Sequence, residues 1–356
     1  MVVARDFEAV SVPYAAGVAA AMLLPSPMQL PAIPVCIAAA VCLIVIYCRR
    51  SGGNPILPAA LLFVCGVLSG CSAASLPFHG SFTPFSGALG AFTGAIEGCG
   101  LHDEESIALA KALLTGDRSS MSRETVAAFR EAGAAHILAL SGLHLGIIYG
   151  ILTKALCWTG RGRVGGIVKS CVTMACCGFY TVMTGSGASV VRAFLFICLN
   201  EAARLSPHRR RRPLSVFCAA LLVQLCLNPL VIRSVGFQLS YLAMLGIYTL
   251  FPVMDSWYPE SAKFDPLRKL WSTAALSISC QIFTAPLAWW HFRSFPVYFL
   301  ITNIVALPLS EMLMLSALAA TAMSAAGLPC GLAAGVCELS SGLLVEFLER
   351  VASLPT

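Results

Sequence analysis

The chain has 356 residues, of which 58% are hydrophobic and 11% charged, with a mean hydropathy of +0.82 and a formal net charge of +6. An ordinary soluble domain carries about 25% charged residues, so this composition excludes a large soluble domain and suits a lipid bilayer. At roughly 25 to 30 residues per span and its loop, the length allows about ten or eleven transmembrane helices. The predicted fold class is all-α, a polytopic transmembrane helical bundle.

Apolar runs recur along the whole chain and are the expected membrane spans. Three of them form an N-terminal transmembrane part over residues 1–75, and the others belong to a transmembrane domain over residues 132–350. The run near Pro308 is longer than one crossing, so it is either one kinked helix or a broken pair. The runs lie near residues 12–26, 29–48, 54–75, 135–158, 164–184, 186–204, 213–228, 235–253, 270–290, 295–325 and 329–350.

Residues 76–131 form the longest stretch without an apolar run. The first half contains Pro77, Pro84 and several glycines and is typical of a loop. Residues 104–114 and 123–132 show helical periodicity with mixed charge, which predicts amphipathic helices at the membrane interface. Asp117 and Ser122 are candidate helix caps around the intervening turn.

The distribution of Lys and Arg predicts a cytoplasmic N-terminus. If the spans alternate from that start, most basic residues fall in cytoplasmic loops, as the positive-inside rule expects, and residues 76–131 face outward. The arginine run at 209–212 is then a topology signal or an anionic-lipid contact. The cytoplasmic set is Arg5, Arg49, Arg50, Arg161, Arg163, Lys169, Arg204, Arg209 to Arg212, Lys263, Arg268 and Lys269.

Sixteen cysteines are present, but most lie within apolar runs, where they act as small apolar packing residues. Cys71 and Cys99 flank the outward stretch, so a disulfide between them is one possibility. No cysteine pair has zinc-ligand spacing with nearby histidines. We expect no metal site and no cofactor.

The run His136–Gly150 combines polar groups with a repeat of small residues. Gly142, Gly146 and Gly150 recur every four residues, which predicts close packing against another helix. The polar residues of this run are either satisfied by interhelical hydrogen bonds or line a pore. The spacing of Ser141 and His144 resembles a nucleophile and base, but no third orienting group accompanies them, so no catalytic residue is expected. The pore-lining candidates here are His136, Ser141 and His144.

Further polar residues interrupt the later apolar runs and are candidates for lining a cavity or contacting DNA. Arg192 lies about six residues into a span, where a charge costs on the order of 3 kcal/mol unless it is paired or hydrated. A structural salt bridge to Glu311 is the alternative. The remaining candidates are Gln238, Ser240, Gln281 and Asn303.

Four stretches in this order resemble the competence domain of the ComEC family. They are TGDRSSMSRETVAAFREAGAAHILALSGLHLG, SGASVVRAF, GFQLSYLAMLGI and QIFTAPLAWWHFRSFPVYFLITNIVALPLSE, and the resemblance covers roughly residues 104–325. Proteins of this family admit single-stranded DNA across the inner membrane during natural transformation. The resemblance therefore implies a multi-pass inner-membrane channel component whose partners are single-stranded DNA and membrane lipids.

The chain also departs from the longer members of that family. Those members carry an oligonucleotide-binding-like domain, for which residues 76–101 are too short, and a metallo-β-lactamase-like domain. No HxHxDH sequence occurs among the six histidines, so this chain is not expected to be an enzyme. The resemblance then implies separate nuclease, DNA-receptor and ATP-driven motor proteins as partners, and a homo-oligomer is possible.

Two other functions fit the same residues. Broken helices with buried polar groups also occur in secondary transporters, so a carrier of a small or lipid-linked solute is the main alternative. A competence-domain protein with only a scaffold role is the third hypothesis.

Overall fold

A computed structural model of the chain describes residues 3–49, 56–75, 85–158, 162–205, 213–259, 265–292 and 298–354. Within these ranges the chain is helical and contains no strand, which confirms the all-α prediction. The arginine run at 209–212 lies outside the described residues. The α-helices are α1 (Val3–Leu23), α2 (Ser26–Arg49), α3 (Ile56–Ser75), α4 (Ser86–Glu97), α5 (Glu104–Thr115), α6 (Arg123–Glu131), α7 (Ala135–Leu138), α8 (Gly142–Ala155), α9 (Arg163–Met183), α10 (Ala188–Leu205), α11 (Pro213–Leu227), α12 (Val235–Thr249), α13 (Phe251–Asp255), α14 (Pro266–Phe292), α15 (Phe299–Ala325) and α16 (Gly331–Ala352), with 3-10 turns η1 (Leu156–Trp158) and η2 (Pro229–Arg233).

Five described helices contain segments long and apolar enough to cross a membrane. These segments are Ser26–Ile46, Ile56–Ser75, Val164–Met183, Phe299–Ala325 and Gly331–Ala352. Three shorter apolar helices cover Glu8–Leu23, Pro213–Leu227 and Val235–Thr249. Many apolar side chains on these helices are exposed, including Val35 and Val41 on α2, as expected for helices that contact lipid.

Two of the expected spans differ from the apolar runs that predicted them. The run at 135–158 is broken by an extended residue, Ala139, between α7 and α8. Within the run at 295–325, residues 299–325 form one continuous helix, α15, that passes through Pro308. The alternative of a broken pair around Pro308 is therefore wrong.

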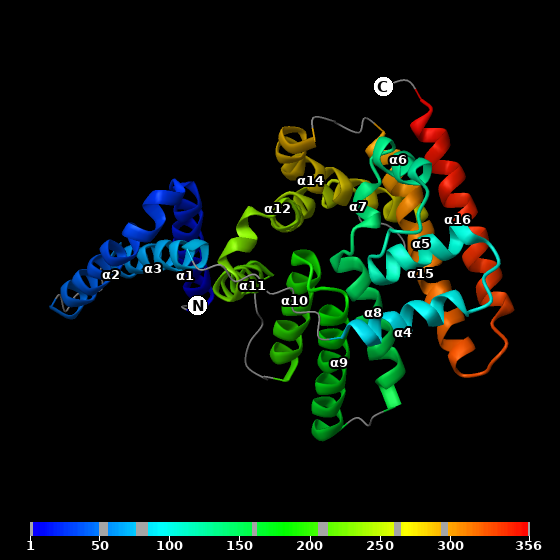
Figure 1. Cartoon of the computed structure of the whole chain (residues 1–356), viewed down its shortest axis with the longest axis horizontal. Coiled ribbons are helices and arrows are strands. Elements are labelled where there is room, and N and C mark those ends of the chain that lie inside the picture. Colours follow the sequence, from blue (N-terminus) through cyan, green and yellow to red (C-terminus); the bar gives the residue numbers. More distant parts are fainter. Residues whose placement is uncertain are drawn as a thin grey trace. The chain divides into compact units, whose positions relative to one another are not determined.

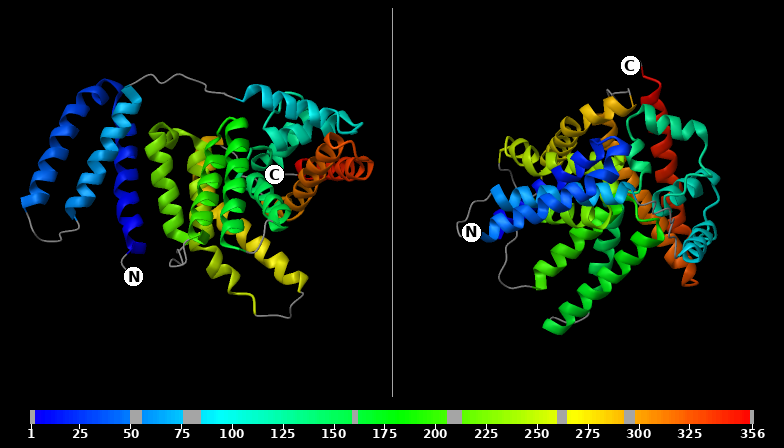
Figure 2. Two further views of the ribbon diagram at one scale, coloured as in Figure 1. Left: turned by 90° about the horizontal axis from the view of Figure 1, so that it is seen from below. Right: turned by 60° about the vertical axis from the view of Figure 1, so that its left-hand side comes forward.

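The described chain divides into two compact units, and the first contains a tight three-helix contact. This unit comprises Met1–Phe82, Gly160–Met174 and Val191–Ser240. Figure 2 shows α1, α2 and α3 side by side. A Cβ on Gly17 would lie 2.1 Å from the Phe63 carbonyl oxygen, and one on Gly66 would lie 2.2 Å from the Tyr14 carbonyl oxygen. Only glycine permits this approach of α1 to α3.

The second unit comprises Thr83–Thr159, Ala175–Val190 and Tyr241–Thr356 and contains a large apolar core. Its α15 and α16 pack side by side as an antiparallel pair (Figure 1). Helices α4, α5 and α6 pack against this pair, and α7 packs against α5 and α6. Leu109, Phe129, Leu313 and Leu344 are all fully buried in this core. The core thus joins the middle of the sequence to its last two helices.

Replacing Gly66 with leucine should destabilise the first unit because the new side chain meets the backbone of α1. The expected loss is roughly 1 to 3 kcal/mol, the usual cost of overpacking. Gly166→Leu on α9 is the matched control, since a Cβ at Gly166 meets nothing within 4 Å. Thermal unfolding of both variants in detergent measures the difference, and equal stability would contradict the close α1–α3 contact.

Candidate functional site

Helices α5 and α6 begin and end at local capping residues. The Asp103 side chain accepts a hydrogen bond from the Ser106 amide at 3.0 Å, and the Ser122 side chain accepts one from the Thr125 amide at 2.9 Å. Gly116 ends α5 with a left-handed φ of 82°, a conformation that favours glycine. The prediction that Ser122 caps a helix is confirmed, whereas Asp117 lies in the turn and caps neither helix.

The turn between α5 and α6 is held by Asp117 and Arg118. The Ser119 side chain and amide donate hydrogen bonds to the Asp117 carboxylate, which lowers the pKa of that carboxyl. The Arg118 guanidinium donates from Nε at 3.1 Å and from Nη2 at 2.7 Å to the Leu138 carbonyl oxygen. A forked, charged donor is stronger than a neutral one, so Arg118 fixes this turn against the segment that joins α7 to α8.

That joining segment is closed by Ser141 and His144. The Ser141 amide donates to His144 Nδ1 at 2.9 Å, the two side chains lie 3.0 Å apart, and the Leu143 amide donates to Ser141 Oγ at 3.2 Å. This is a reciprocal cap at the start of α8. The single lone pair of Nδ1 accepts the Ser141 amide, so it is not available as a base for the Ser141 hydroxyl. The geometry favours a structural cap.

The C-terminal half of α9 is tied to the same group of helices. Tyr180 donates its hydroxyl to the Leu114 carbonyl oxygen at 2.8 Å, and the rings of Phe179 and Phe85 lie 5.0 Å apart in an edge-to-face arrangement. The turn of Arg118, the cap of His144 and the end of α9 all lie in the second unit, and we refer to them together as its polar centre.

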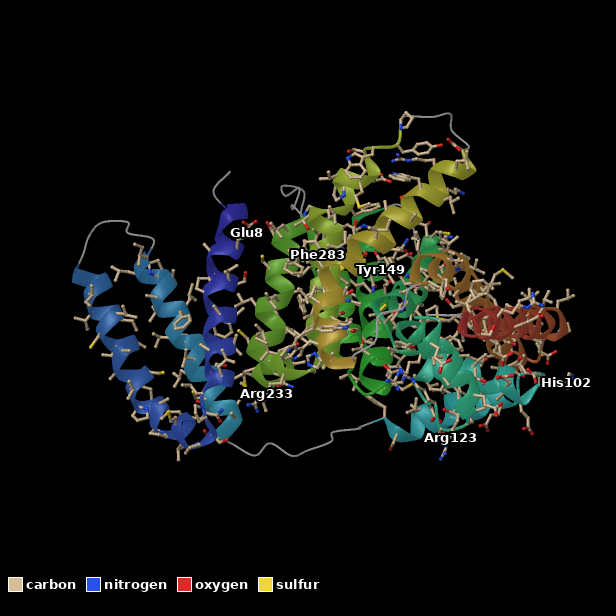
Figure 3. The ribbon with its side chains drawn as sticks, turned by 90° about the horizontal axis from the view of Figure 1, so that it is seen from above. Glu8, His102, Arg123, Tyr149, Arg233 and Phe283 are labelled. Atoms are coloured by element: carbon tan, nitrogen blue, oxygen red, sulfur yellow. The ribbon has the colours of Figure 1, made fainter. Side chains whose placement is uncertain are left out.

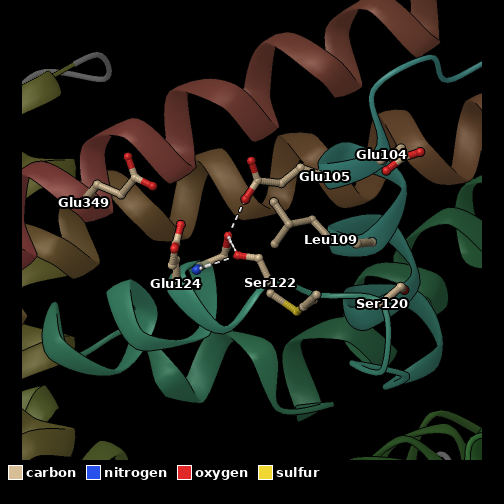
Figure 4. Close-up of a pocket in the computed structure, with 10 residues that line it drawn as sticks. Glu104, Glu105, Leu109, Ser120, Ser122, Glu124 and Glu349 are labelled. Carbon is tan, nitrogen blue, oxygen red and sulfur yellow. Dashed lines mark hydrogen bonds between the residues drawn. The ribbon is translucent and has the colours of Figure 1, made fainter.

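A pocket of about 350 Å³ opens beside this centre and is strongly acidic (Figure 4). Thr125 donates a hydrogen bond to Glu105 at its wall. Like charges repel phosphate, so this pocket does not suit a DNA strand. Within the described part of the chain, no group of three or more His, Cys, Asp or Glu side chains is placed to hold a metal ion. The four carboxylates that line the pocket belong to Glu104, Glu105, Glu124 and Glu349.

Two charged residues are buried on α10, within the first unit. Arg192 is only 9% exposed and Glu201 only 2%. Ser170 on α9 donates a hydrogen bond to Glu201 Oε2, and Arg204 Nη1 lies 2.9 Å from Glu201 Oε1. Buried charge in an apolar helix needs such partners or water. The alternative pairing of Arg192 with Glu311 would join the two units and stays a hypothesis.

The other candidate residues are distributed over both units. In the first unit, Gln238 donates its side-chain amide to the Ile232 carbonyl oxygen at 2.7 Å, and Ser240 is half-buried. In the second unit, Gln281 and Asn303 are half-buried, and the Asn303 Oδ1 has no hydrogen-bond partner among the described residues. His136 is exposed. Among the pore-lining candidates, Ser141 and His144 contact each other, and pore lining stays a prediction.

Of the close helix contact expected at Gly142, Gly146 and Gly150, the described residues provide none at Gly146 or Gly150. A Cβ on Gly146 or Gly150 meets nothing within 4 Å. The four-residue spacing places the glycines on one face, but a spacing cannot supply a partner helix. In the second unit the close approach falls at Gly246 on α12 instead, where a Cβ would lie 2.4 Å from the Ser279 carbonyl oxygen of α14.

Sequence reasoning did not single out Arg118, Tyr180 and Glu201, whose side chains form hydrogen bonds between separate elements. Arg118 and Glu201 had a detectable signal, because each is a charge beside or within an apolar run. The Tyr180 bond had none, since its acceptor is a backbone carbonyl 66 residues earlier in the chain.

The fold and these buried polar groups define a helical membrane protein. Residues 113–356 match the family model described as "Competence protein", and the chain belongs to this family. The resemblance to ComEC-family proteins is thereby confirmed. The matched residues include Arg118, Ser141, His144 and Arg192.

Curated relatives match the chain over part of their length. The chain is 28% identical to ComE operon protein 3 of Bacillus subtilis over 205 residues, which is 57% of this chain and 25% of that protein. It is 26% identical to the uncharacterized protein YcaI of Escherichia coli over 246 residues, which is 65% of this chain and 29% of that protein. The chain therefore spans under a third of the length of these two relatives. No solved structure matches it significantly.

Replacing Ser141 separates a capping role from a catalytic one. Ser141→Ala should lower stability by about 0.5 to 2 kcal/mol because α8 loses its cap. Ser141→Asp keeps a capping oxygen but has no nucleophilic hydroxyl, so it should retain both stability and transformation frequency. Thermal unfolding and transformation assays test this pair, and loss of transformation by a stable Ser141→Asp protein would refute the capping role.

Arg118→Gln should destabilise the second unit by about 1.5 to 3 kcal/mol, the typical worth of a hydrogen bond to a charged group. Arg123→Gln is the control: Arg123 is exposed at the first turn of α6, at the edge of the second unit (Figure 3). Thermal unfolding in detergent should separate the two variants. If they unfold at the same temperature, the bond from Arg118 to Leu138 does not hold the turn.

Proposed function

We propose that this protein is a channel component that admits single-stranded DNA across the cytoplasmic membrane during natural transformation. Its membership of the competence family supports a role in DNA uptake. Its apolar helices support residence in a membrane. The passage of a strand through these helices, the inner-membrane location and the cytoplasmic N-terminus are parts of the proposal.

The observation that carries the proposal is the buried guanidinium of Arg192. It lies on α10 in the SGASVVRAF run, and its neighbours Val190, Val191, Ala193 and Phe194 are apolar. A strand in transit needs a hydrated path that is not strongly anionic, because each phosphate carries a negative charge. Guanidinium stays charged at any accessible pH and offers several donors to phosphate oxygens. Arg192 is therefore the residue that we assign to phosphate contact.

The same proposal assigns other tasks to other proteins. We propose that the chain has no enzymatic activity of its own, because the sequence offers no HxHxDH ligand set. A separate nuclease would degrade the second strand, a receptor would deliver DNA, and an ATP-driven motor would supply work. The acidic pocket of the second unit lies off the proposed path because its charge repels phosphate.

Arg192→Gln should lower transformation frequency while folded protein stays in the membrane. Binding of single-stranded DNA should lose about 0.7 in the log-log slope of affinity against salt, which corresponds to one phosphate contact. Arg192→Lys keeps the charge without the fork and should retain part of the uptake. Transformation frequency, membrane abundance and the salt slope are measured on both variants.

Other outcomes of this experiment point to the alternatives. If Arg192 is structural, Arg192→Gln cuts abundance, and a second change, Glu311→Gln, partly restores it by removing the unpaired partner. Solute counterflow by reconstituted protein without any DNA effect would favour a secondary transporter. Normal uptake by well-folded Arg192→Gln protein would overturn the phosphate contact.

A further inference from the structure

Two cysteines from distant parts of the sequence meet within the second unit. Cys99 lies just after α4 and is fully buried, and Cys330 directly precedes α16 and is partly exposed. The Cys330 Sγ lies 3.1 Å from the Cys99 carbonyl oxygen. It also lies 3.1 Å from the point where a Cβ on Gly100 would stand. The Cys330 sulfur therefore rests directly against the backbone of residues 99 and 100.

Hydrogen bonds hold the segments around Cys99 and Cys330 against each other. The Ser324 hydroxyl donates to the Gly98 carbonyl oxygen at 3.2 Å, on one side of the cysteines. On the other side, the His102 amide donates to Glu338 Oε1 at 2.6 Å, and the hydroxyls of Ser106 and Ser341 are hydrogen-bonded. The backbones that carry the two thiols are thus fixed by contacts that do not involve sulfur.

We propose that Cys99 and Cys330 form a disulfide in the oxidising compartment outside the cytoplasmic membrane. The Cys330 sulfur already contacts the Cys99 main chain, and a disulfide requires such proximity of the two cysteines. This inference goes beyond the proposed function. It rests on the predicted outward orientation of residues 76–131 and not on DNA passage.

The difference in exposure sets the order of the two reaction steps. Cys330 is accessible, so its thiolate attacks a disulfide of the thiol–disulfide oxidoreductase class and releases one thiol. The Cys99 thiolate then attacks the mixed disulfide, forms the Cys99–Cys330 bond and releases the second thiol. Two electrons pass from the cysteines to the oxidant, and the two thiol protons end on the released thiols.

A third thiol, that of Cys337, is excluded from the first step but competes with Cys99 for the second, because both are fully buried. Cys337 lies on α16, is fully buried, and directs its thiol to the Leu313 carbonyl oxygen at 3.9 Å. A soluble oxidant cannot reach it. Cys337 is therefore the competing partner that the experiment must exclude.

The contact also constrains the membrane topology. It places the turn before α16 on the same side as Cys99, whereas strict alternation of all the predicted spans would place it on the opposite side. One of the intervening apolar segments then does not cross the membrane.

The test maps the thiols of the full-length protein in membranes from cells with an oxidising periplasm. Free thiols are blocked with N-ethylmaleimide, and peptides are analysed with and without reductant. We expect a linked Cys99–Cys330 peptide that reductant removes. Cys99→Ser should make Cys330 alkylatable, whereas Cys157→Ser, at an exposed position of η1, should leave the linked peptide in place. Oxidised glutathione should form the same link in purified protein.

Several results would overturn the proposal. These are complete alkylation of Cys99 and Cys330 in the cell membranes, a bond that forms only in purified protein, and a bond that joins either cysteine to Cys337. The measurement does not involve DNA, so failure of the channel proposal and failure of the disulfide are distinguishable.

Discussion

The backbone of a chain in a bilayer must satisfy its own hydrogen bonds, and the rest of this structure depends on that constraint. Lipid offers no donors or acceptors, so a helix is the structure that an apolar run of this chain can adopt there. Helix α15 shows the strength of the constraint, because it remains continuous through Pro308 although proline lacks an amide donor. The same rule requires each helix end and each polar side chain to find a partner.

The partners are supplied by a small number of polar contacts between elements. Arg118 satisfies the carbonyl oxygen of Leu138 where α7 ends, and the pair of Ser141 and His144 satisfies amides where α8 begins. Tyr180 satisfies a carbonyl oxygen in the last turn of α5. The bonds of Arg118, Ser141 and His144 fall within the longest family-like run of the sequence. Their common role is structural.

The sequence was most informative where local physics decides the structure. Apolar length predicted the all-α fold, and periodicity with mixed charge predicted α5 and α6 close to their observed bounds. It was less informative where packing decides. The mixed charge of residues 104–114 predicted a helix at the membrane interface, yet α5 is buried almost all round in an apolar core, where Lys111 pairs with Glu97 at 2.9 Å. The glycines of α8 predicted a close contact, but that contact depends on a neighbouring helix, which spacing alone cannot reveal.

The central claim is the proposal that the helices of this protein form a path for a DNA strand across the membrane. The direct measurement uses purified protein in liposomes with a fluorescent single-stranded oligonucleotide outside. A membrane potential that is negative inside and one that is positive inside are applied in turn. Added nuclease then digests whatever strand stays outside. The account predicts a nuclease-protected fraction of the oligonucleotide only when the potential is positive inside, because that potential draws the anionic strand into the liposome. Protection should also require the protein in the liposome membrane. Complete digestion under both potentials, with the protein folded and inserted, would contradict it.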